Sequence, residues 1–226
     1  MIKQTITALA FAATALGVGA AQAADLPRAP MYTKAPPMAP VFDWTGFYIG
    51  GNIGYGSAHV DATVPGATGS ENLTGVIGGG QLGYNWQTGP WVFGLEADFQ
   101  GSDQHANFAG GGVTENDSVP WFATFRGRIG YAVAPMWMLY VTGGGAVMDF
   151  KSNVTAAGVG SATFETSHAG WTIGAGVEGA ITRNWSWKAE YLHIDTGNFN
   201  TTLLGVVPLT FRMTDDIGRF GINYRF

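Results

Sequence analysis

Two short histidine-containing pairs are the strongest candidates for catalytic chemistry in this sequence. His193 lies two residues before Asp195, and Ser167 directly precedes His168. A hydroxyl, an imidazole and a carboxylate can form a hydrolytic triad, but only where folding brings them together in space. Because sequence spacing does not establish that convergence, we interpret these residues as polar positions in loops and at strand ends. No catalytic residue is assigned.

The glycine pattern is the second candidate, because segments 78–83 and 174–179 both match G-x-G-x-x-G. Such a motif holds a dinucleotide only where a strand runs into a helix whose N-terminus faces the pyrophosphate. No helical periodicity follows either match, so no cofactor-binding residue is assigned and no cofactor is expected. We predict instead that these glycines lie within strands and leave room for bulky neighbours.

Composition excludes several further classes of function. The chain has no cysteine, which removes disulfides, thiolate metal sites and cysteine nucleophiles, and its four histidines lack metal-ligand spacing, so no metal site is assigned. The net charge is −5 without a basic cluster, which argues against a nucleic-acid partner. Charged residues make up 12% of the chain, about half of the ~25% typical of soluble domains. The composition indicates a protein with little aqueous surface.

The first 43 residues predict an exported protein. Lys3, an apolar stretch over about 6–18, and small residues at Ala21 and Ala23 form a signal-peptide pattern, with cleavage after Ala23. Residues 24–43 then form a proline-rich lead, which we predict to be an extended periplasmic linker rather than a PxxP ligand. Half of the chain's ten prolines lie in this lead: Pro27, Pro30, Pro36, Pro37 and Pro40.

From about residue 44 the hydrophobic pattern has a period of two. In "WVFGLEADFQ" (91–100), Trp91, Phe93 and Leu95 alternate with residues that include Glu96 and Asp98. This alternation is typical of strands. The predicted strands cover about 46–58, 74–87, 91–101, 118–131, 137–150, 168–181, 185–195 and 214–226. The uncharged run 129–148 would suit a transmembrane helix, but Pro135 and the alternation favour a hairpin.

The connections between these strands alternate between short and long. Three to five residues join strands two and three, four and five, and six and seven, whereas segments 59–73, 102–117, 151–167 and 196–213 are predicted to be long polar loops. Short periplasmic turns and long external loops are typical of outer-membrane barrels. The sequence therefore predicts an all-β protein, an eight-stranded antiparallel up-and-down transmembrane β-barrel over residues 44–226.

The two faces of the strands indicate which side meets lipid. Aromatic residues near the predicted turns would form an interfacial girdle: Tyr84, Trp86, Trp91, Trp121, Tyr131, Trp185, Trp187 and Phe226. The opposite face would line the lumen with charged residues: Glu96, Asp98, Arg126, Arg128, Glu178, Lys188, Glu190, Arg219 and Arg225. Since unpaired charges would be costly in an interior just wide enough for side chains, we expect an ion-pair network that plugs the lumen.

The opening "FDWTGFYIGGNIGYG" (42–56) and the ending "INYRF" (222–226) carry a family resemblance. They resemble the small outer-membrane β-barrel proteins of alphaproteobacteria, the surface-antigen or porin-family proteins, which are similar in fold to the OmpA barrel. The resemblance implies residence in the outer membrane of a Gram-negative cell, surface-exposed loops and no enzymatic activity. It also implies a C-terminal signal read by the barrel-assembly machinery, carried by Phe220, Ile222, Tyr224 and Phe226.

The expected function is therefore a structural one, in envelope integrity and surface interaction, without enzymatic activity. The expected partners are outer-membrane lipid and, during biogenesis, the assembly machinery. A narrow passive pore or a haem-binding receptor is the alternative, because some members of the family bind haem, and no residue here is assigned to haem or to another surface ligand. An outer-membrane lipid-modifying enzyme is the least favoured alternative.

Overall fold

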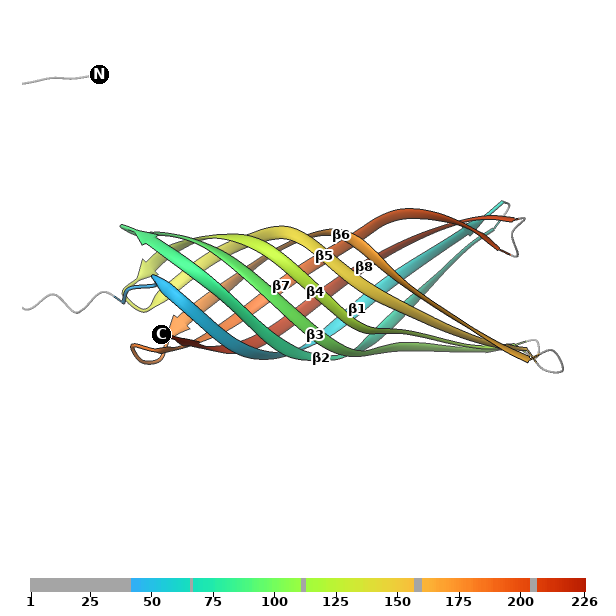
Figure 1. The fold of residues 1–226 in the computed structure, drawn as a ribbon, viewed down its shortest axis with the longest axis horizontal. Coiled ribbons are helices and arrows are strands. Elements are labelled where there is room, and N and C mark those ends of the chain that lie inside the picture. The colour runs from blue at the N-terminus through green and yellow to red at the C-terminus, as the bar shows by residue number, and fades with distance from the viewer. Residues whose placement is uncertain (1–41, 66, 111–112, 157–159, 204–206) are drawn as a thin grey trace, which may run out of the picture. The chain divides into compact units, whose positions relative to one another are not determined.

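Eight antiparallel strands form one closed barrel in which β8 pairs with β1 (Figure 1). The protein is represented by a computed structural model that describes residues 42–65, 67–110, 113–156, 160–203 and 207–226. The predicted signal peptide and the lead up to residue 41 lie outside these residues. The predicted up-and-down barrel is confirmed, and its strands are β1 (Gly46–Val64), β2 (Ala67–Thr88), β3 (Trp91–Gly110), β4 (Val113–Ala134), β5 (Trp137–Ala156), β6 (Gly160–Ala180), β7 (Trp185–Leu203) and β8 (Val207–Arg225).

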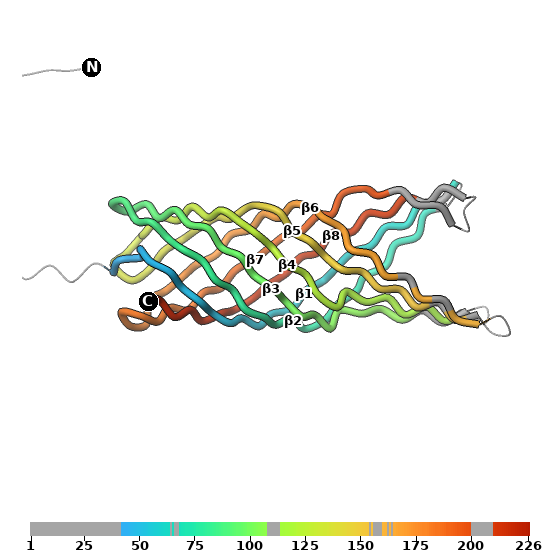
Figure 2. Tube along the Cα trace, in the orientation of Figure 1, coloured from blue at the N-terminus to red at the C-terminus, as the bar shows by residue number. Residues whose placement is uncertain are grey.

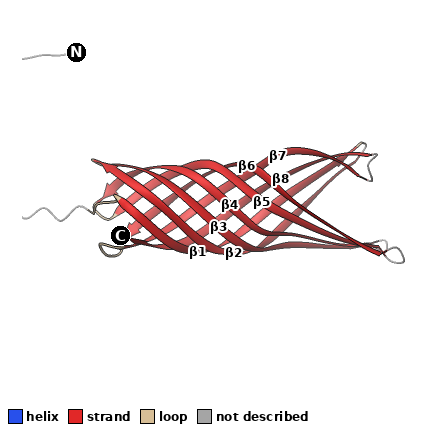
Figure 3. Cartoon of the chain, in the orientation of Figure 1, coloured by secondary structure: helices blue, strands red, loops and turns tan. Residues whose placement is uncertain are grey.

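The three connections that we predicted to be short lie at the same end of the barrel as the C-terminus (Figure 1). Gly89 has a φ of +59° and turns the chain between β2 and β3, a conformation that glycine adopts without steric cost. The uncharged run 129–148 forms the hairpin of β4 and β5, with its turn at Pro135 and Met136. Within the described residues no helix is long and apolar enough to cross a membrane. The secondary structure is drawn in Figure 3.

The strands extend much further than the sequence predicted, to 19–22 residues each. The segments predicted as long loops, 59–73, 102–117, 151–167 and 196–213, are mostly strand, so this prediction was wrong. Antiparallel pairing continues across β1 and β2 as far as the Val64–Ala67 pair, because a hairpin satisfies its backbone hydrogen bonds whatever the polarity of its side chains. A membrane needs only ~9–11 residues of each strand, so about half of each strand lies beyond it.

At the end away from the C-terminus the barrel divides into two groups of hairpins. Pairing of β2 with β3 stops at Thr74 and His105, and pairing of β6 with β7 stops at Trp171 and Asp195. Pairing of β1 with β8 and of β4 with β5 continues almost to the tips. Figure 2 shows the result, with β7, β8, β1 and β2 in one group and β3 to β6 in the other.

The outer surface carries an apolar belt around the half of the barrel nearest the C-terminus. Large apolar side chains point outward from every strand, among them Ile49, Leu82, Leu95, Phe125, Val141, Ile173, Trp185 and Ile222. Edge-to-face aromatic pairs mark the border of the belt nearest the C-terminus: Phe47–Tyr84, Trp91–Tyr131, Trp137–Trp187 and Trp185–Tyr224. Trp121, which we predicted near the turns, lies instead toward the opposite border, stacked on Phe99 with ring centroids 5.6 Å apart.

Candidate functional site: the barrel lumen

The nine charged residues predicted to line the lumen all point into it and are buried. The period of two places them on the inner face of five strands. β3 contributes Glu96 and Asp98, β4 Arg126 and Arg128, β6 Glu178, β7 Lys188 and Glu190, and β8 Arg219 and Arg225.

Arg126 is the centre of the part of this network that lies farther from the C-terminus, which we call the upper part. Its Nη1 donates to Glu190 Oε1 at 3.0 Å, and its Nη2 donates to Asp98 Oδ2 at 2.7 Å and also to Glu96. Its Nε donates to Thr124 Oγ1 at 2.9 Å. One guanidinium therefore contacts three carboxylates from two strands.

Two further cations complete the upper part. Arg219 donates through Nε to Glu190 Oε2 at 2.7 Å and through Nη2 to Asp98 Oδ2 at 3.2 Å. Lys188 Nζ lies 2.9 Å from both carboxylate oxygens of Glu96. Three cations thus meet three carboxylates, and the upper part of the network is formally neutral.

The lower part of the network, nearer the C-terminus, contains two arginines and one carboxylate. Arg128 Nη2 donates to Glu178 Oε2 at 2.7 Å, whereas Arg225 Nη2 lies 3.8 Å from Glu178 Oε1. Ser186 also donates to Glu178 at 2.6 Å, and Asn223 donates at 3.3 Å. Arg225 Nη1 donates instead to the backbone oxygen of Asp43 at 3.0 Å. This part therefore has one more positive than negative group.

Neutral side chains that sequence reasoning did not assign to the site complete the network, and Tyr48 connects its two parts. Tyr48 OH donates to Glu96 Oε2 at 2.8 Å and accepts from Arg128 Nη1 at 3.3 Å. Thr124 and Ser186 donate to carboxylates in the same way. In the sequence these residues alternate with lipid-facing ones. A polar residue at a position that faces the lumen in this alternation is the signal that could have identified them.

Inward-facing glycines make room for the long charged side chains. A Cβ added to Gly54 would lie 2.7 Å from the Cβ of Arg219, and one added to Gly94 would lie 2.9 Å from Cγ of Arg128. The glycines of the two G-x-G-x-x-G segments lie within β2 and β6, as predicted. A side chain at Gly83 or Gly176 would meet a tyrosine hydroxyl at 2.4 or 2.6 Å.

The chain just before β1 folds under the barrel and covers this end of the lumen. Trp44 is fully buried and its backbone N–H donates to Gln87 Oε1 at 2.7 Å. Phe42 stacks edge-on against Trp44 with centroids 4.6 Å apart, and its N–H donates to the oxygen of Pro135 at 3.2 Å. The Arg225 guanidinium lies 5.0 Å from the Trp44 ring and 4.8 Å from the Phe42 ring. We call Phe42, Asp43 and Trp44 the stopper.

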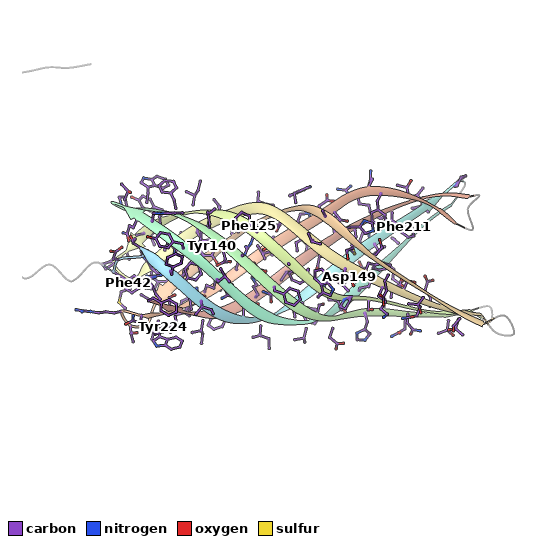
Figure 4. The ribbon with its side chains drawn as sticks, viewed as in Figure 1. Phe42, Phe125, Tyr140, Asp149, Phe211 and Tyr224 are labelled. Atoms are coloured by element: carbon purple, nitrogen blue, oxygen red, sulfur yellow. The ribbon has the colours of Figure 1, made fainter. Side chains whose placement is uncertain are left out.

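Above the charged network the lumen is filled by apolar side chains. This apolar layer consists of Ala58, Val60, Leu73, Ile77, Val119, Phe122, Ala146, Met148, Leu192, Ile194, Met213 and Ile217. Phe211 packs against it from the side farther from the membrane, at the opposite end of the barrel from the stopper residue Phe42 (Figure 4). The ion-pair network is thus confined to the membrane half, and beyond it only scattered polar side chains are buried, Gln104, Asp117 and Asp215 among them.

One buried carboxyl interrupts the apolar layer. Asp215 is fully buried on β8 and accepts a hydrogen bond from Gln104 Nε2 at 2.9 Å. Its outward neighbour Asp216 is polar and half exposed, so both lie beyond the apolar belt. Burial raises the pKa of Asp215 to about 7, against the lowering effect of the Gln104 hydrogen bond.

The residues considered for hydrolytic chemistry do not converge. Ser167 donates to Asp149 at 2.7 Å, whereas His168 Nε2 lies 3.2 Å from the Thr166 hydroxyl. His193 Nδ1 is 2.7 Å from Asp216. Asp195 accepts instead from Arg212 at 2.7 Å. Among the described residues, no three His, Cys, Asp or Glu side chains are grouped to hold a metal ion.

The four residues of the predicted assembly signal share the outer face of β8. Phe220, Ile222 and Phe226 are exposed, and Tyr224 is partly exposed and packs against Trp185. The N–H of Phe226 donates to the oxygen of Phe47 at 3.1 Å, so the chain end is held at the junction of the first and last strands.

A closed antiparallel barrel with an apolar belt outside and ion pairs inside defines the class of outer-membrane β-barrels, because only closure satisfies strand backbones in lipid. The sequence model of the outer membrane protein beta-barrel domain matches residues 10–226, and the chain belongs to this family. It is an outer-membrane protein of the kind found in Gram-negative bacteria.

Named relatives come from alphaproteobacteria, as the resemblance predicted. The chain is 38% identical over 214 residues to the 31 kDa outer-membrane immunogenic protein of Brucella melitensis, covering 85% of this chain and 89% of that protein. It is 37% identical over 162 residues to the 22 kDa outer membrane protein of Rhizobium leguminosarum bv. viciae, covering 70% and 67%. Among solved structures, the outer membrane protease OmpT of Escherichia coli superposes with a TM-score of 0.54 at 9% identity, covering 80% of this chain and 97% of that one, which reflects the fold alone.

Proposed function

We propose that this protein is a non-conducting, non-enzymatic barrel that strengthens the outer membrane and presents its four long hairpins at the cell surface. Outer-membrane lipid is its constant partner, and the barrel-assembly machinery binds it during biogenesis. The relatives in Brucella are named immunogenic, which supports surface exposure of the hairpins here as well.

The observation that carries this proposal is the continuous filling of the lumen. The stopper, the ion-pair network and the apolar layer follow one another along the barrel, and their central side chains are buried, Trp44, Arg126 and Phe122 completely. An eight-stranded barrel has an interior just wide enough for side chains to fill it. Ions crossing it would have to displace paired charges and then pass an apolar layer, and both steps oppose conduction.

Single-channel recording in planar bilayers tests this proposal. We expect the wild-type barrel to show no stable conductance. The triple variant Trp44→Ala, Arg126→Ala and Phe122→Ala removes a central side chain from each of the three barriers and should produce measurable current. The control variant Arg212→Ala lies on the outside of the barrel and should remain silent. A large, stable wild-type conductance would contradict the proposal and favour the pore alternative.

The structural role has a separate test in cells. Deletion of the gene should increase sensitivity to detergents and the release of vesicles, and the folded protein should shift on gels after boiling. Restoration by the triple variant would assign the role to the barrel and its hairpins. An unchanged envelope in the deletion strain would contradict a structural role.

A further inference from the structure

The end of the lumen next to the stopper contains buried hydrogen-bond donors without acceptors. These donors are Trp44 Nε1, Asn85 Nδ2, Arg128 Nε, Tyr140 OH, and Nε and Nη2 of Arg225, and none has a hydrogen-bond partner among the residues that the structure describes. Each of the five residues is at most 4% exposed. Buried polar groups in native proteins are almost always paired, so such a concentration requires an explanation.

The unpaired groups elsewhere in the described lumen are of the opposite kind. They are all oxygen acceptors: Asn52 Oδ1, Gln100 Oε1, Asp117 Oδ1 and Asp215 Oδ2. Near the stopper the only orphaned acceptor besides the Tyr140 hydroxyl is Asn85 Oδ1. Donors are therefore in excess at one end of the barrel only.

Shared neighbours place these donors in the same part of the lumen. Asn85 Oδ1 and Arg128 Cγ both lie within 3 Å of the position of a Cβ on Gly94. The Arg128 guanidinium covers the Tyr140 ring at 4.0 Å, and Tyr140 belongs to the same buried cluster as Trp44. Figure 4 shows Tyr140 and Phe42 at the same end of the barrel.

The same region has an excess of positive charge. Arg128 and Arg225 share one buried carboxylate, Glu178, with closest contacts of 2.7 and 3.8 Å. The other six charges of the network balance among themselves. The side chain of Asp43 lies on the exposed side of the stopper and accepts from the N–H of Thr45. One buried positive charge thus has no close carboxylate of its own among the described residues.

We propose that this region binds a small monovalent anion such as chloride, held by Arg225, Arg128, Asn85 Nδ2 and Trp44 Nε1. An anion accepts hydrogen bonds without donating any, so it matches a set of groups with almost no free acceptor. A water molecule would bring two donors, for which only Asn85 Oδ1 and the Tyr140 hydroxyl are free acceptors among the described residues, and it would leave the extra positive charge unbalanced. A single negative charge also balances the extra arginine, whose burial unpaired would be costly. The stopper closes the site toward the periplasm.

Unfolding of the refolded barrel at constant ionic strength tests this proposal. Sodium gluconate, whose anion is too large for the site, is exchanged stepwise for sodium chloride or bromide while the urea midpoint is measured. A ligand at 100 times its Kd favours the folded state about 100-fold, so the midpoint should rise with halide. An unchanged midpoint in the wild type would overturn the proposal.

Variants separate a bound anion from a general salt effect. Arg225→Gln removes the charge and should abolish the halide-dependent rise, whereas Arg225→Lys should restore part of it. Trp44→Phe keeps the ring contact but removes one donor, so it should reduce the rise and remains informative if Arg225→Gln does not fold. The control Arg212→Gln on the outer face should respond like the wild type. An equal response of all variants would overturn the proposal.

Crystals grown in bromide give a direct readout. The proposal requires an anomalous peak about 3.2–3.5 Å from Trp44 Nε1 and Asn85 Nδ2, slightly beyond ordinary N–H···O distances because the halide is larger than oxygen. The peak should be absent in Arg225→Gln. A site without anomalous signal, filled by water alone, would contradict the anion and leave the proposed structural function of the barrel unaffected.

Discussion

The membrane half of this barrel and the half beyond the apolar belt are built from the same strands with opposite patterns. β8 shows both. In its membrane half the outward residues are apolar and the inward residues are polar: Phe220, Ile222, Tyr224 and Phe226 against Arg219, Asn223 and Arg225. Farther from the C-terminus the outward residues are polar and the inward residues mostly apolar: Arg212, Thr214 and Asp216 against Phe211, Met213 and Ile217.

The reversal follows the solvent outside the barrel. Around the belt the surroundings are hydrocarbon, so apolar side chains face outward and the interior accommodates the charges. Beyond the belt the surroundings are water, and the sheet buries its apolar face inside as a soluble barrel does. β7 changes at the same level, with Lys188 and Glu190 inward below and Leu192 and Ile194 inward above. Apolar and polar side chains alternate along the whole of each strand, and only the face that carries the apolar ones changes, from the outer to the inner.

The largest test of this contrast is the removal of the central cation. Arg126→Leu leaves Glu96, Asp98 and Glu190 without one of their shared partners in a buried site. Removing one member of a buried ion pair costs about 3–5 kcal/mol, and we expect a loss of unfolding free energy in this range. Urea unfolding in lipid vesicles measures it. The control Lys151→Leu removes a cation from an exposed ion pair with Glu165 and should unfold close to the wild type, and equal effects would mean that the network contributes nothing specific.

The second test exploits Asp215, a carboxyl that is completely buried in the apolar layer. Asp215→Asn keeps the shape and the Gln104 contact but removes the charge. The pKa of Asp215 is raised to about 7, so between the unfolded value of about 4 and about 7 the folded state binds more protons than the unfolded state. Wild-type stability should therefore fall as pH rises through this window.

The asparagine variant should lack this part of the pH dependence and be more stable than the wild type at pH 8. One pKa unit corresponds to about 1.4 kcal/mol, so the gain is at most about 4 kcal/mol. Urea midpoints from pH 4 to pH 8 measure it. If both proteins showed the same pH profile, Asp215 would be paired or solvated in the folded barrel.

Two isoleucines on β8 provide a matched comparison of the two apolar environments. Ile217 is fully buried in the apolar layer, whereas Ile222 points outward and is 44% exposed. Ile217→Val leaves a gap that neighbouring side chains fill only partly, and should cost about 1 kcal/mol. Ile222→Val faces lipid, which adapts to the smaller side chain, so we expect a smaller loss. Equal losses would show that lipid fills the gap no better than the protein interior does.

The two halves also differ in how far the sequence predicted them. In the membrane half the alternation of apolar and polar residues along each strand predicted that all nine charged side chains point into the lumen, because lipid outside demands apolar side chains on the outer face. It did not predict which charge meets which, since contacts such as Arg219 with Asp98 join strands far apart in the chain and depend on the register of the closed barrel.

The half beyond the apolar belt was mispredicted because its polarity resembles that of loops. Segment 196–213 contains inward Phe199, Phe211 and Met213, an apolar alternation that a strand with its inner face buried would produce. That alternation is interrupted by the bulge between Asp195 and Asn198. The role of Trp44 was also missed, because a single aromatic after a proline-rich segment carries no periodicity.

The smallest expected effect on stability, and the sharpest contrast between folding and biogenesis, lies at the last residue. The Phe226 side chain is 77% exposed, and its hydrogen bond to Phe47 uses the backbone. Phe226→Ala loses only the edge-to-face contact with the Tyr224 ring, with centroids 5.3 Å apart, and should therefore change the unfolding free energy by about 1 kcal/mol at most. If the outer face of β8 is the assembly signal, the same variant should nevertheless reduce outer-membrane levels several-fold in cells.

Phe47→Ala, on β1 and 66% exposed, is the matched control and should assemble normally. Equal loss of both variants would mean that assembly responds to the apolar belt in general and not to the terminal strand.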